Sequence, residues 1–300
     1  MYRRDHLRQG EESNVTRSLI AGSVSGLLAR FGTAPMDTIK IRLQITPGNA
    51  SSGKALNVVK EMLHKEGIRG LWKGNVPGSL MYVVYGGVQF GTYTFYNQLL
   101  SPLAWNSQWH SFVVGALAGM SSSFVSYPFD VLRTRFVADR SRQLSTLRNT
   151  ITRMFREDGP RGLFKGLTSS MVTITLATSI LFSTYESIRI YCERPQRNAL
   201  HRTLDTFASP IAGLISKLAT FPLDTIRRRL VLSNSSDHKS FGNLYKSYHR
   251  RSVAQIGLQI IRQEGITALY RGVTMALCKS VPSTAISLWS FERSMALLGG

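Results

Sequence analysis

Three stretches of this sequence place a proline, an acid and two bases at the same spacing within apolar surroundings. They are APMDTIKIRLQ from Ala34, YPFDVLRTRFV from Tyr127 and FPLDTIRRRLV from Phe221. The prolines, Pro35, Pro128 and Pro222, recur at intervals of 93 and 94 residues. An acid and a base three residues apart lie on neighbouring faces of a helix, so such charges can pair between helices. A proline inside a helix removes one hydrogen bond, and we expect a kink at each copy.

A second motif follows each of these stretches. It reads EGIRGLWKG from Glu66, DGPRGLFKG from Asp158 and EGITALYRG from Glu264, always with an acid and a glycine at the start and an aromatic residue, a base and a glycine at the end. Two motifs repeated three times in one order indicate homologous units that stack into a single structure. We expect the three units at residues 14–100, 108–193 and 205–297.

The composition favours an anionic partner. Thirty-seven bases against 17 acids give a formal charge of +20, which suits a nucleic acid, a membrane face or a phosphorylated ligand. Two cysteines and six scattered histidines predict neither a disulfide framework nor a metal site. A nucleotide-binding GxxxxGK[ST] loop and a nucleophile elbow are both missing from the sequence, so we expect neither an ATP-driven pump nor a hydrolase, and no cofactor.

Long uncharged segments predict membrane spans. Residues 74–129 contain no Asp, Glu, Lys or Arg, which leaves room for two spans of about 20 residues each, and residues 166–185 form a third such run. Three further uncharged stretches each end at a single base, namely Arg30, Lys217 or Lys279. The sequence therefore predicts an all-α membrane protein with six transmembrane helices, two in each repeat.

The charges of the connecting segments predict an orientation. Residues 40–73 carry seven bases and two acids, whereas residues 97–110 carry no Asp, Glu, Lys or Arg. Basic loops tend to remain on the inner side of a membrane, so both termini are expected outside. The segment ALNVVKEMLHKEG within the first basic loop has the apolar spacing of a short helix that lies along the membrane surface.

The threefold combination of PxDxxKxR or PxDxxRxR with the acid–glycine to base–glycine motif resembles the mitochondrial carrier family over residues 14–297. The resemblance implies a multi-pass, monomeric transport domain of the inner mitochondrial membrane, with three pseudosymmetric repeats, short matrix-side helices and alternating access between a matrix gate and a cytoplasmic gate. Within this family, the stretches GLLARFGTAPMDTIKIRLQ and WKGNVPGSLMYVVYG resemble fungal carriers of thiamine pyrophosphate.

This resemblance implies import of thiamine pyrophosphate by exchange, with another nucleotide-like or coenzyme phosphate anion as the alternative substrate. Among membrane lipids, cardiolipin is a candidate partner. A basic RNA-binding protein is the alternative of a different class. It is disfavoured, and no nucleic-acid partner is expected, because the bases occur at repeat-related positions beside uncharged spans and because the chain contains no nucleic-acid-binding module.

For the matrix gate the resemblance implies three ion pairs between neighbouring repeats. They join Asp37 with Arg133, Asp130 with Arg227 and Asp224 with Lys40. Gln44 occupies a position at which a glutamine braces such a pair, whereas valines occupy the equivalent positions in the other two repeats. Charge pairs near a membrane interior contribute little net stability because the charges lose their hydration, and that property suits a gate that must open and close.

For the cytoplasmic gate the resemblance implies an aromatic residue, an acid and a base near the end of each even-numbered span. The aromatic residues are Tyr93, Tyr185 and Phe291, and the acids and bases present are Glu186, Arg189 and Glu292. Taken around the ring of repeats, no acid faces a base. We therefore expect a weak outer gate and a resting state that opens outward.

The three single bases, Arg30, Lys217 and Lys279, are the main candidates for substrate binding, because an ionisable residue within a span is costly to keep there. If they converge on one cavity they suit a diphosphate; otherwise they extend to the lipid headgroups. The same offset within each repeat places Met81 and Thr173 opposite Lys279. Further candidates nearby are Tyr82, Tyr85, Gln89 and Ile174. The tyrosines either stack on a pyrimidine or thiazolium ring or pack within the bundle.

Overall fold

The computed structural model describes residues 15–46, 55–103, 106–139, 147–192, 199–233, 248 and 252–299. This part of the chain is helical, with no strand, which confirms the all-α prediction. Residues 14 and 193, where the first predicted repeat begins and the second ends, lie outside it.

The same order of elements occurs three times along the chain. A long helix is followed by a short helix, a single turn of 3-10 helix and a second long helix. The first long helices are α1 (Val15–Ile45), α4 (Ser107–Ala138) and α7 (Ala199–Leu232). The short helices are α2 (Ala55–Glu66), α5 (Leu147–Glu157) and α8 (Val253–Glu264), and the 3-10 turns are η1 (Ile68–Trp72), η2 (Pro160–Phe164) and η5 (Ile266–Tyr270). The second long helices are α3 (Asn75–Leu100), α6 (Leu167–Cys192) and the pair α9 (Val273–Cys278) and α10 (Ser280–Gly299).

Two of the described helical segments are long and apolar enough to cross a membrane by length and composition alone. They are Trp109–Ala138 and Pro160–Cys192. The remaining long helices are more polar, because α1 and α7 carry charged residues beyond the repeated acid and bases, such as Arg30 and Lys217, and because α3 is rich in Gly, Tyr, Asn and Gln. Hydropathy by itself therefore identifies fewer spans than the six that the repeats predict.

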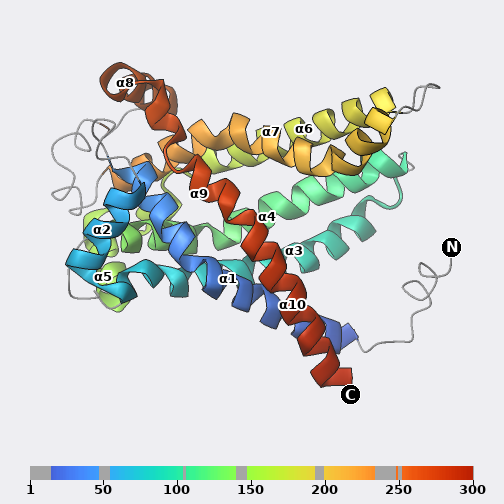
Figure 1. Cartoon of the computed structure of the whole chain (residues 1–300), viewed down its shortest axis with the longest axis horizontal. Coiled ribbons are helices and arrows are strands. Elements are labelled where there is room, and N and C mark those ends of the chain that lie inside the picture. Colours follow the sequence, from blue (N-terminus) through green and yellow to red (C-terminus); the bar gives the residue numbers. More distant parts are fainter. Residues whose placement is uncertain are drawn as a thin grey trace.

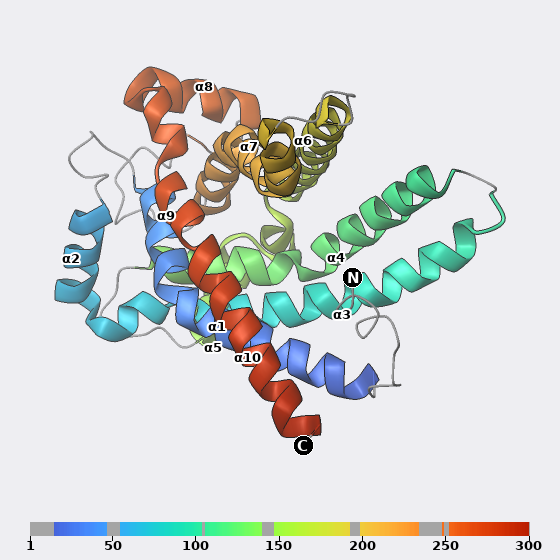
Figure 2. The same cartoon turned by 45° about the vertical axis from the view of Figure 1, so that its right-hand side comes forward.

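The long helices pack in three pairs, α3 with α4, α6 with α7 and α1 with α10. The last of these pairs joins the third repeat back to the first and closes a ring. The helices α2, α5 and α8 lie at one end of the bundle, called here the basic end, and α1 begins and α10 ends at the other, called here the terminal end (Figure 1). Figure 2 shows the three pairs diverging toward the terminal end.

The helices α1, α4 and α7 continue through Pro35, Pro128 and Pro222. A proline leaves the carbonyl four residues earlier without its helical donor. In the first repeat that carbonyl belongs to Phe31, and the indole nitrogen of Trp72 donates to it at 3.1 Å. The aromatic residue of the second motif thus satisfies a backbone group that the proline of the first motif exposes.

The second motif ties each short helix to its long helix. Its acid binds the second base of the PxDxxKxR pattern, so that Glu66 pairs with Arg42 at 2.6 Å, Asp158 pairs with Arg135, and Glu264 pairs with Arg229. The glycine after each acid and the glycine that ends each motif all have φ between 63° and 85°, a left-handed conformation that favours glycine. The pairing is the same in all three repeats although the two residues are 24, 23 and 35 positions apart, because the longer connection of the third repeat lies between them.

The last span of the third repeat is divided into α9, which ends at Cys278, and α10, which begins at Ser280. Lys279 between them keeps helical dihedral angles, and its N–H donates to the Met275 carbonyl while the Ser283 N–H donates to the Lys279 carbonyl, so the helix continues through it. Pro282 has no N–H to donate to the Cys278 carbonyl, so one helical hydrogen bond is missing at this point. The missing bond lies beside Lys279, one of the three predicted substrate-binding bases.

Candidate functional site

All three predicted ion pairs are present, where α1, α4 and α7 converge near the basic end. Arg133 Nη2 lies 2.8 Å from Asp37 Oδ2, and Lys40 Nζ lies 3.6 Å from Asp224 Oδ2. The third pair joins Arg227 Nη2 and Asp130 Oδ2. Together the pairs link α1 to α4, α4 to α7 and α7 to α1, and no side chain among them is more than 17% exposed.

Gln44 lies beside this ring of charges without contacting a charged atom of it. Its amide nitrogen donates to Thr225 Oγ1 at 3.3 Å, and Thr225 follows Asp224 on α7. Its carbonyl oxygen is buried and has no hydrogen-bond partner in the described part of the chain. Gln44 therefore links α1 to α7 next to the Lys40–Asp224 pair. Its partner is Thr225, the residue after Asp224, and not a charged residue of the pair that it was predicted to brace.

Two of the three single bases share the acids of these pairs. Lys279 Nζ lies 2.8 Å from Asp37 Oδ1, and Lys217 Nζ lies 3.4 Å from Asp224 Oδ2. The Lys217 side chain is 42% exposed, so it extends from the pair into open space. Each of these two carboxylates therefore binds two cations. Asp37 binds Arg133 and Lys279, and Asp224 binds Lys40 and Lys217.

Arg30 differs from the two lysines. Its guanidinium packs against Gly78 of α3 so closely that a Cβ at Gly78 would lie 2.0 Å from Arg30 Nη2. The same hypothetical Cβ would lie 3.1 Å from Arg133 Nε, so two guanidinium groups converge on one glycine. Within the described residues Arg30 makes no ion pair, and its Nε is buried without a hydrogen bond.

Two cavities adjoin the ion pairs. The first, called here the lysine cavity, has a volume of about 370 Å³. Bases, an acid and hydroxyl groups line it: Asp37, Lys40, Lys217, Lys279, Ser280, Ser283 and Thr284, together with Ala276. Ammonium and hydroxyl donors of this kind suit the oxygens of a phosphate group.

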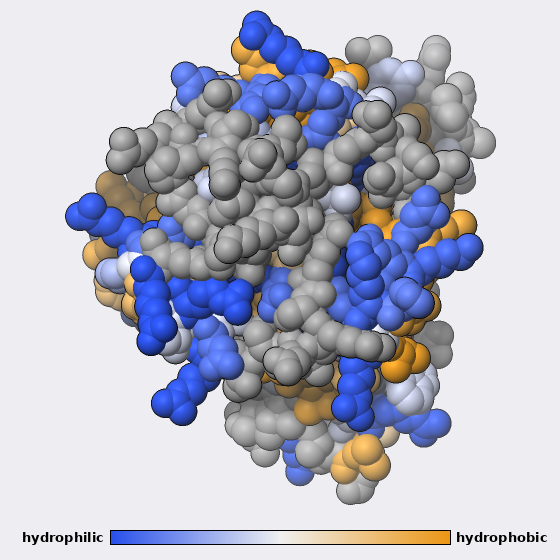
Figure 3. Space-filling model, turned by 90° about the vertical axis from the view of Figure 1, so that its left-hand side faces the viewer, coloured by the Kyte–Doolittle hydropathy of each residue, from blue (hydrophilic) through white to orange (hydrophobic). Residues whose placement is uncertain are grey.

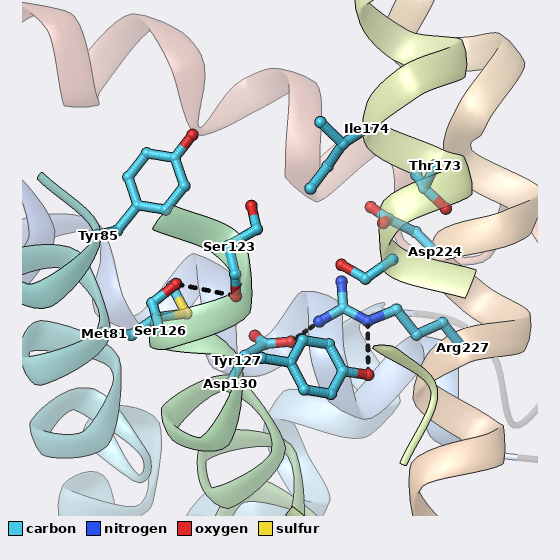
Figure 4. A pocket seen from close by; sticks show the side chains of 11 residues that line it. Met81, Tyr85, Ser123, Ser126, Tyr127, Asp130, Thr173, Ile174, Asp224 and Arg227 are labelled. Atoms are coloured by element: carbon cyan, nitrogen blue, oxygen red, sulfur yellow. Dashed lines mark hydrogen bonds and ion pairs between the residues drawn. The ribbon is translucent and has the colours of Figure 1, made fainter. Parts of the chain in front are cut away.

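The second, called here the tyrosine cavity, has a volume of about 220 Å³. Met81 and Tyr85 of α3 lie across it from Thr173 and Ile174 of α6 (Figure 4). Its floor consists of charged and hydroxyl side chains from α4 and α7, and Asp224, which binds Lys40 and Lys217 of the lysine cavity, belongs to its lining. The two cavities are therefore neighbours, joined at Asp224.

Three predicted substrate-binding residues, Arg30, Tyr82 and Gln89, do not line either cavity. Arg30 packs against Gly78, and the other two belong to α3. The ring of Tyr82 packs over Gly26 of α1, where an added Cβ would lie 2.8 Å from Tyr82 Cε1, and the residue is 49% exposed. Gln89 lies one helical turn beyond Tyr85 on α3. Sequence spacing selects the correct helix for both residues, but it does not resolve which side of the helix faces the cavity.

The predicted cytoplasmic-gate residues lie toward the terminal end. Glu186 and Glu292 are exposed and make no ion pair with any residue that the structure describes. The guanidinium carbon of Arg189 lies 5.9 Å from the centre of the Tyr185 ring. Tyr93 is exposed and Phe291 is partly buried.

Sequence reasoning missed two aromatic residues at the ion pairs. The guanidinium carbon of Arg227 lies 4.9 Å from the centre of the Tyr127 ring, and Lys40 Nζ lies 5.2 Å from the centre of the Phe221 ring. Both aromatic residues directly precede a repeated proline. The sequence shows an aromatic residue before the proline in the second and third repeats, whereas the first repeat has Ala34 at that position. This difference between the repeats is the signal that could have identified Tyr127 and Phe221.

The electrostatics of the site suit binding of a small anion. Bases occupy the carboxylates of the ion pairs, while Arg30 is a cation that makes no ion pair within the described residues. No cluster of His, Cys, Asp and Glu in that part of the chain could hold a metal ion.

Comparison with known proteins agrees with this organisation. The family model for mitochondrial carrier proteins matches residues 11–103, 104–195 and 200–300. The chain is 50% identical to mitochondrial thiamine pyrophosphate carrier 1 of Candida glabrata over the full length of both chains. The proteins of that name from Saccharomyces cerevisiae and Kluyveromyces lactis are 47% and 46% identical, over 98% of this chain and 98% and 95% of theirs. The chain therefore belongs to the mitochondrial carrier family.

Proposed function

We propose that this protein imports thiamine pyrophosphate across the inner mitochondrial membrane, in exchange for another phosphorylated compound, and that it is a transporter and not an enzyme. The observation that carries the proposal is its full-length similarity, at 50% identity, to a protein named as a thiamine pyrophosphate carrier. The chemistry of the two adjoining cavities supports the same substrate.

In the proposed complex the diphosphate occupies the lysine cavity. Lys217 and Lys279 bind its oxygens as point charges, and Arg30 supplies a guanidinium able to bind two oxygens at once. The ring portion enters the tyrosine cavity between Tyr85 and Ile174. A positively charged thiazolium ring gains attraction from an aromatic face. Three further residues of the substrate path are Met81, Tyr82 and Thr173, and Gln89 contacts the substrate as it enters.

The three ion pairs between Asp37, Asp130, Asp224 and their partner bases form the matrix gate in this proposal. Residues 14–100, 108–193 and 205–297 move as three repeats, with bends at the prolines, and access alternates between the two sides of the membrane. Tyr93, Tyr185, Glu186, Arg189, Phe291 and Glu292 form the cytoplasmic gate. Among the described residues Glu186 and Glu292 of this gate make no ion pair, and we infer that the resting protein opens toward the cytoplasmic side.

The basic end faces the matrix, and both termini face the intermembrane space. Support for this orientation comes from exposed bases on α2, α5, α8 and the 3-10 turns: Lys60, Lys65, Arg69, Arg148, Arg153, Arg156, Arg161 and Arg262. Figure 3 views the molecule from this side and shows hydrophilic side chains around its rim. Basic segments favour the inner side of a membrane. The protein acts as a monomer, and cardiolipin, an anionic lipid, binds near this face.

Reconstitution in liposomes tests the proposal. Purified protein is assayed for uptake of labelled thiamine pyrophosphate against internal nucleotides, thiamine phosphates or buffer alone. We expect uptake that requires an internal anion and falls in Arg30→Ala, Lys217→Ala and Lys279→Ala, while Arg293→Ala, a change at an exposed base of α10, has little effect. Exchange of nucleotides without uptake of thiamine pyrophosphate would transfer the assignment to another coenzyme or nucleotide anion. Absence of all exchange by folded protein would contradict a carrier function at this site.

A further inference from the structure

Two of the three matrix-side bases rest on an aromatic ring as well as on a carboxylate. Arg227 binds Asp130 and lies over Tyr127, and both of these partners belong to α4. In the same way Lys40 binds Asp224 and lies over Phe221, both of α7. The ring and the acid are three residues apart on one helix, which places them side by side. Each base therefore contacts two adjacent groups of the neighbouring helix.

The remaining pair provides a comparison within the same molecule. Arg133 binds Asp37 of α1 at 2.8 Å, but the residue three positions before Asp37 is Ala34, which offers no ring. Arg133 Nε is buried without a hydrogen bond in the described part of the chain, and the Arg30 guanidinium lies beside it against Gly78. Arg133 therefore has one favourable partner on α1, the carboxylate of Asp37, and its other neighbour is the cation Arg30.

Tyr127 also contacts elements outside the pair. Its hydroxyl donates to the Lys165 carbonyl at 2.7 Å, and Arg227 Nε donates to that hydroxyl at 3.4 Å. Its side chain lines the tyrosine cavity, as Figure 4 shows with the Arg227 guanidinium beside it. Tyr127 is therefore in contact with the cavity, with the ion pair and with the segment that leads into α6.

We propose that Tyr127 and Phe221 are positioning residues of the matrix gate, whose rings hold Arg227 and Lys40 against α4 and α7 and so favour the closed arrangement. Separating α4 from α7, or α7 from α1, requires the base to leave both a carboxylate and an aromatic face. A cation over an aromatic ring gains more when both are removed from water, and these side chains are largely buried. The proposal rests on the proposed function only in that the ion pairs act as a gate.

Spontaneous opening toward the basic end, measured without substrate, tests this role. Ser283 of the lysine cavity is changed to Cys in a chain whose natural cysteines, Cys192 and Cys278, are changed to Ser. Protein of known orientation in liposomes is treated from the basic-end side with a membrane-impermeant thiol reagent. The labelling rate then reports the population of the open state.

Tyr127→Leu is expected to raise this labelling rate by about tenfold, whereas Tyr127→Phe, which keeps the ring, changes it by less than about twofold. Phe124→Leu serves as the matched control, because Phe124 lies one turn earlier on α4 and stacks on Phe164, away from the ion pairs. Labelling from the terminal-end side at the normal rate verifies that each variant is folded. Phe221→Leu supplies a second test should Tyr127→Leu fail to fold.

Equal increases in Tyr127→Leu and Tyr127→Phe would assign the effect to the hydroxyl and overturn the role of the ring. Unchanged labelling in both leucine variants would overturn the proposal as a whole. Since no substrate is present, these outcomes do not depend on which compound is carried. If instead the labelling behaves as expected and uptake of thiamine pyrophosphate is absent, the gate role holds and only the substrate assignment fails.

Discussion

Replacement of Arg30, Lys217 and Lys279 one at a time should reveal unequal contributions to substrate affinity. Arg30 makes no ion pair within the described residues, so a bound phosphate adds an interaction without removing one. Lys279 is 2.8 Å from Asp37 and Lys217 is 3.4 Å from Asp224. Each lysine must therefore exchange a carboxylate for a phosphate oxygen, and the net gain in binding free energy is small.

The magnitudes follow from the energetics of charged hydrogen bonds. A hydrogen bond to a charged group contributes about 1.5–3 kcal/mol, so Arg30→Ala should weaken substrate affinity by about 10- to 100-fold. In Lys279→Ala the hydrogen bond from Lys279 to the phosphate is lost. The loss is offset because the bond between Lys279 and Asp37 no longer has to be broken when the substrate binds. We expect a loss of affinity below about fivefold, because one charge-assisted bond replaces another of similar strength.

The assay is the concentration dependence of thiamine pyrophosphate uptake into liposomes that contain an internal exchange partner. Arg30→Lys should recover part of the loss, since it restores the charge without the two-pronged geometry. Arg293→Ala again serves as the control at an exposed base of α10. A larger loss of affinity in Lys279→Ala than in Arg30→Ala would refute the reasoning, since it would mean that the Lys279–Asp37 contact is not a competitor of the substrate.

Three further predictions concern stability and membrane association. Arg229 is fully buried and pairs with Glu264, so Arg229→Ala should lower the free energy of unfolding by about 3–5 kcal/mol. Lys65 belongs to an exposed pair, and Lys65→Ala should lower it by less than about 1 kcal/mol. Thermal unfolding in detergent compares the two variants. Trp72→Phe removes the donor to the Phe31 carbonyl and should cost about 1 kcal/mol in that assay. Concentrated salt should leave the protein in isolated membranes and detergent should release it; release by salt alone would contradict the transmembrane assignment.

The helical architecture and the ion pairs could be predicted from the sequence because the information is repeated three times. Pairing of Asp130 with Arg227 or of Asp224 with Lys40 follows from one register applied around a ring, and any register error would have broken all three pairs together. The short helix after α1 followed from apolar spacing over ALNVVKEMLHKEG. Such features depend on pattern and symmetry, and they require no knowledge of individual side-chain positions.

Other features could not be predicted because they depend on where single side chains point. Spacing placed Tyr82 and Tyr85 together near the cavity, but helix rotation directs Tyr82 over Gly26 and leaves only Tyr85 in the cavity lining. The contact between Lys279 and Asp37 joins residues from opposite ends of the chain, and it has no equivalent in the other repeats, where Met81 and Thr173 occupy the position of Lys279. Departures from symmetry of this kind carry no signal in a repeated motif.

These departures from symmetry lie at the residues that are proposed to bind the substrate, a molecule that has no threefold symmetry. Each repeat contributes one acid and one base to the ion pairs, but only Asp37 and Asp224 also bind a cavity lysine. The remaining acid, Asp130, lies in the lining of the tyrosine cavity, where its partner Arg227 is held by Tyr127. In the proposed complex, a phosphate that draws the lysines away would act directly on two of the pairs. The ring portion, placed in the tyrosine cavity, would lie beside the third pair, so a molecule with both parts would act on the whole ring of charges.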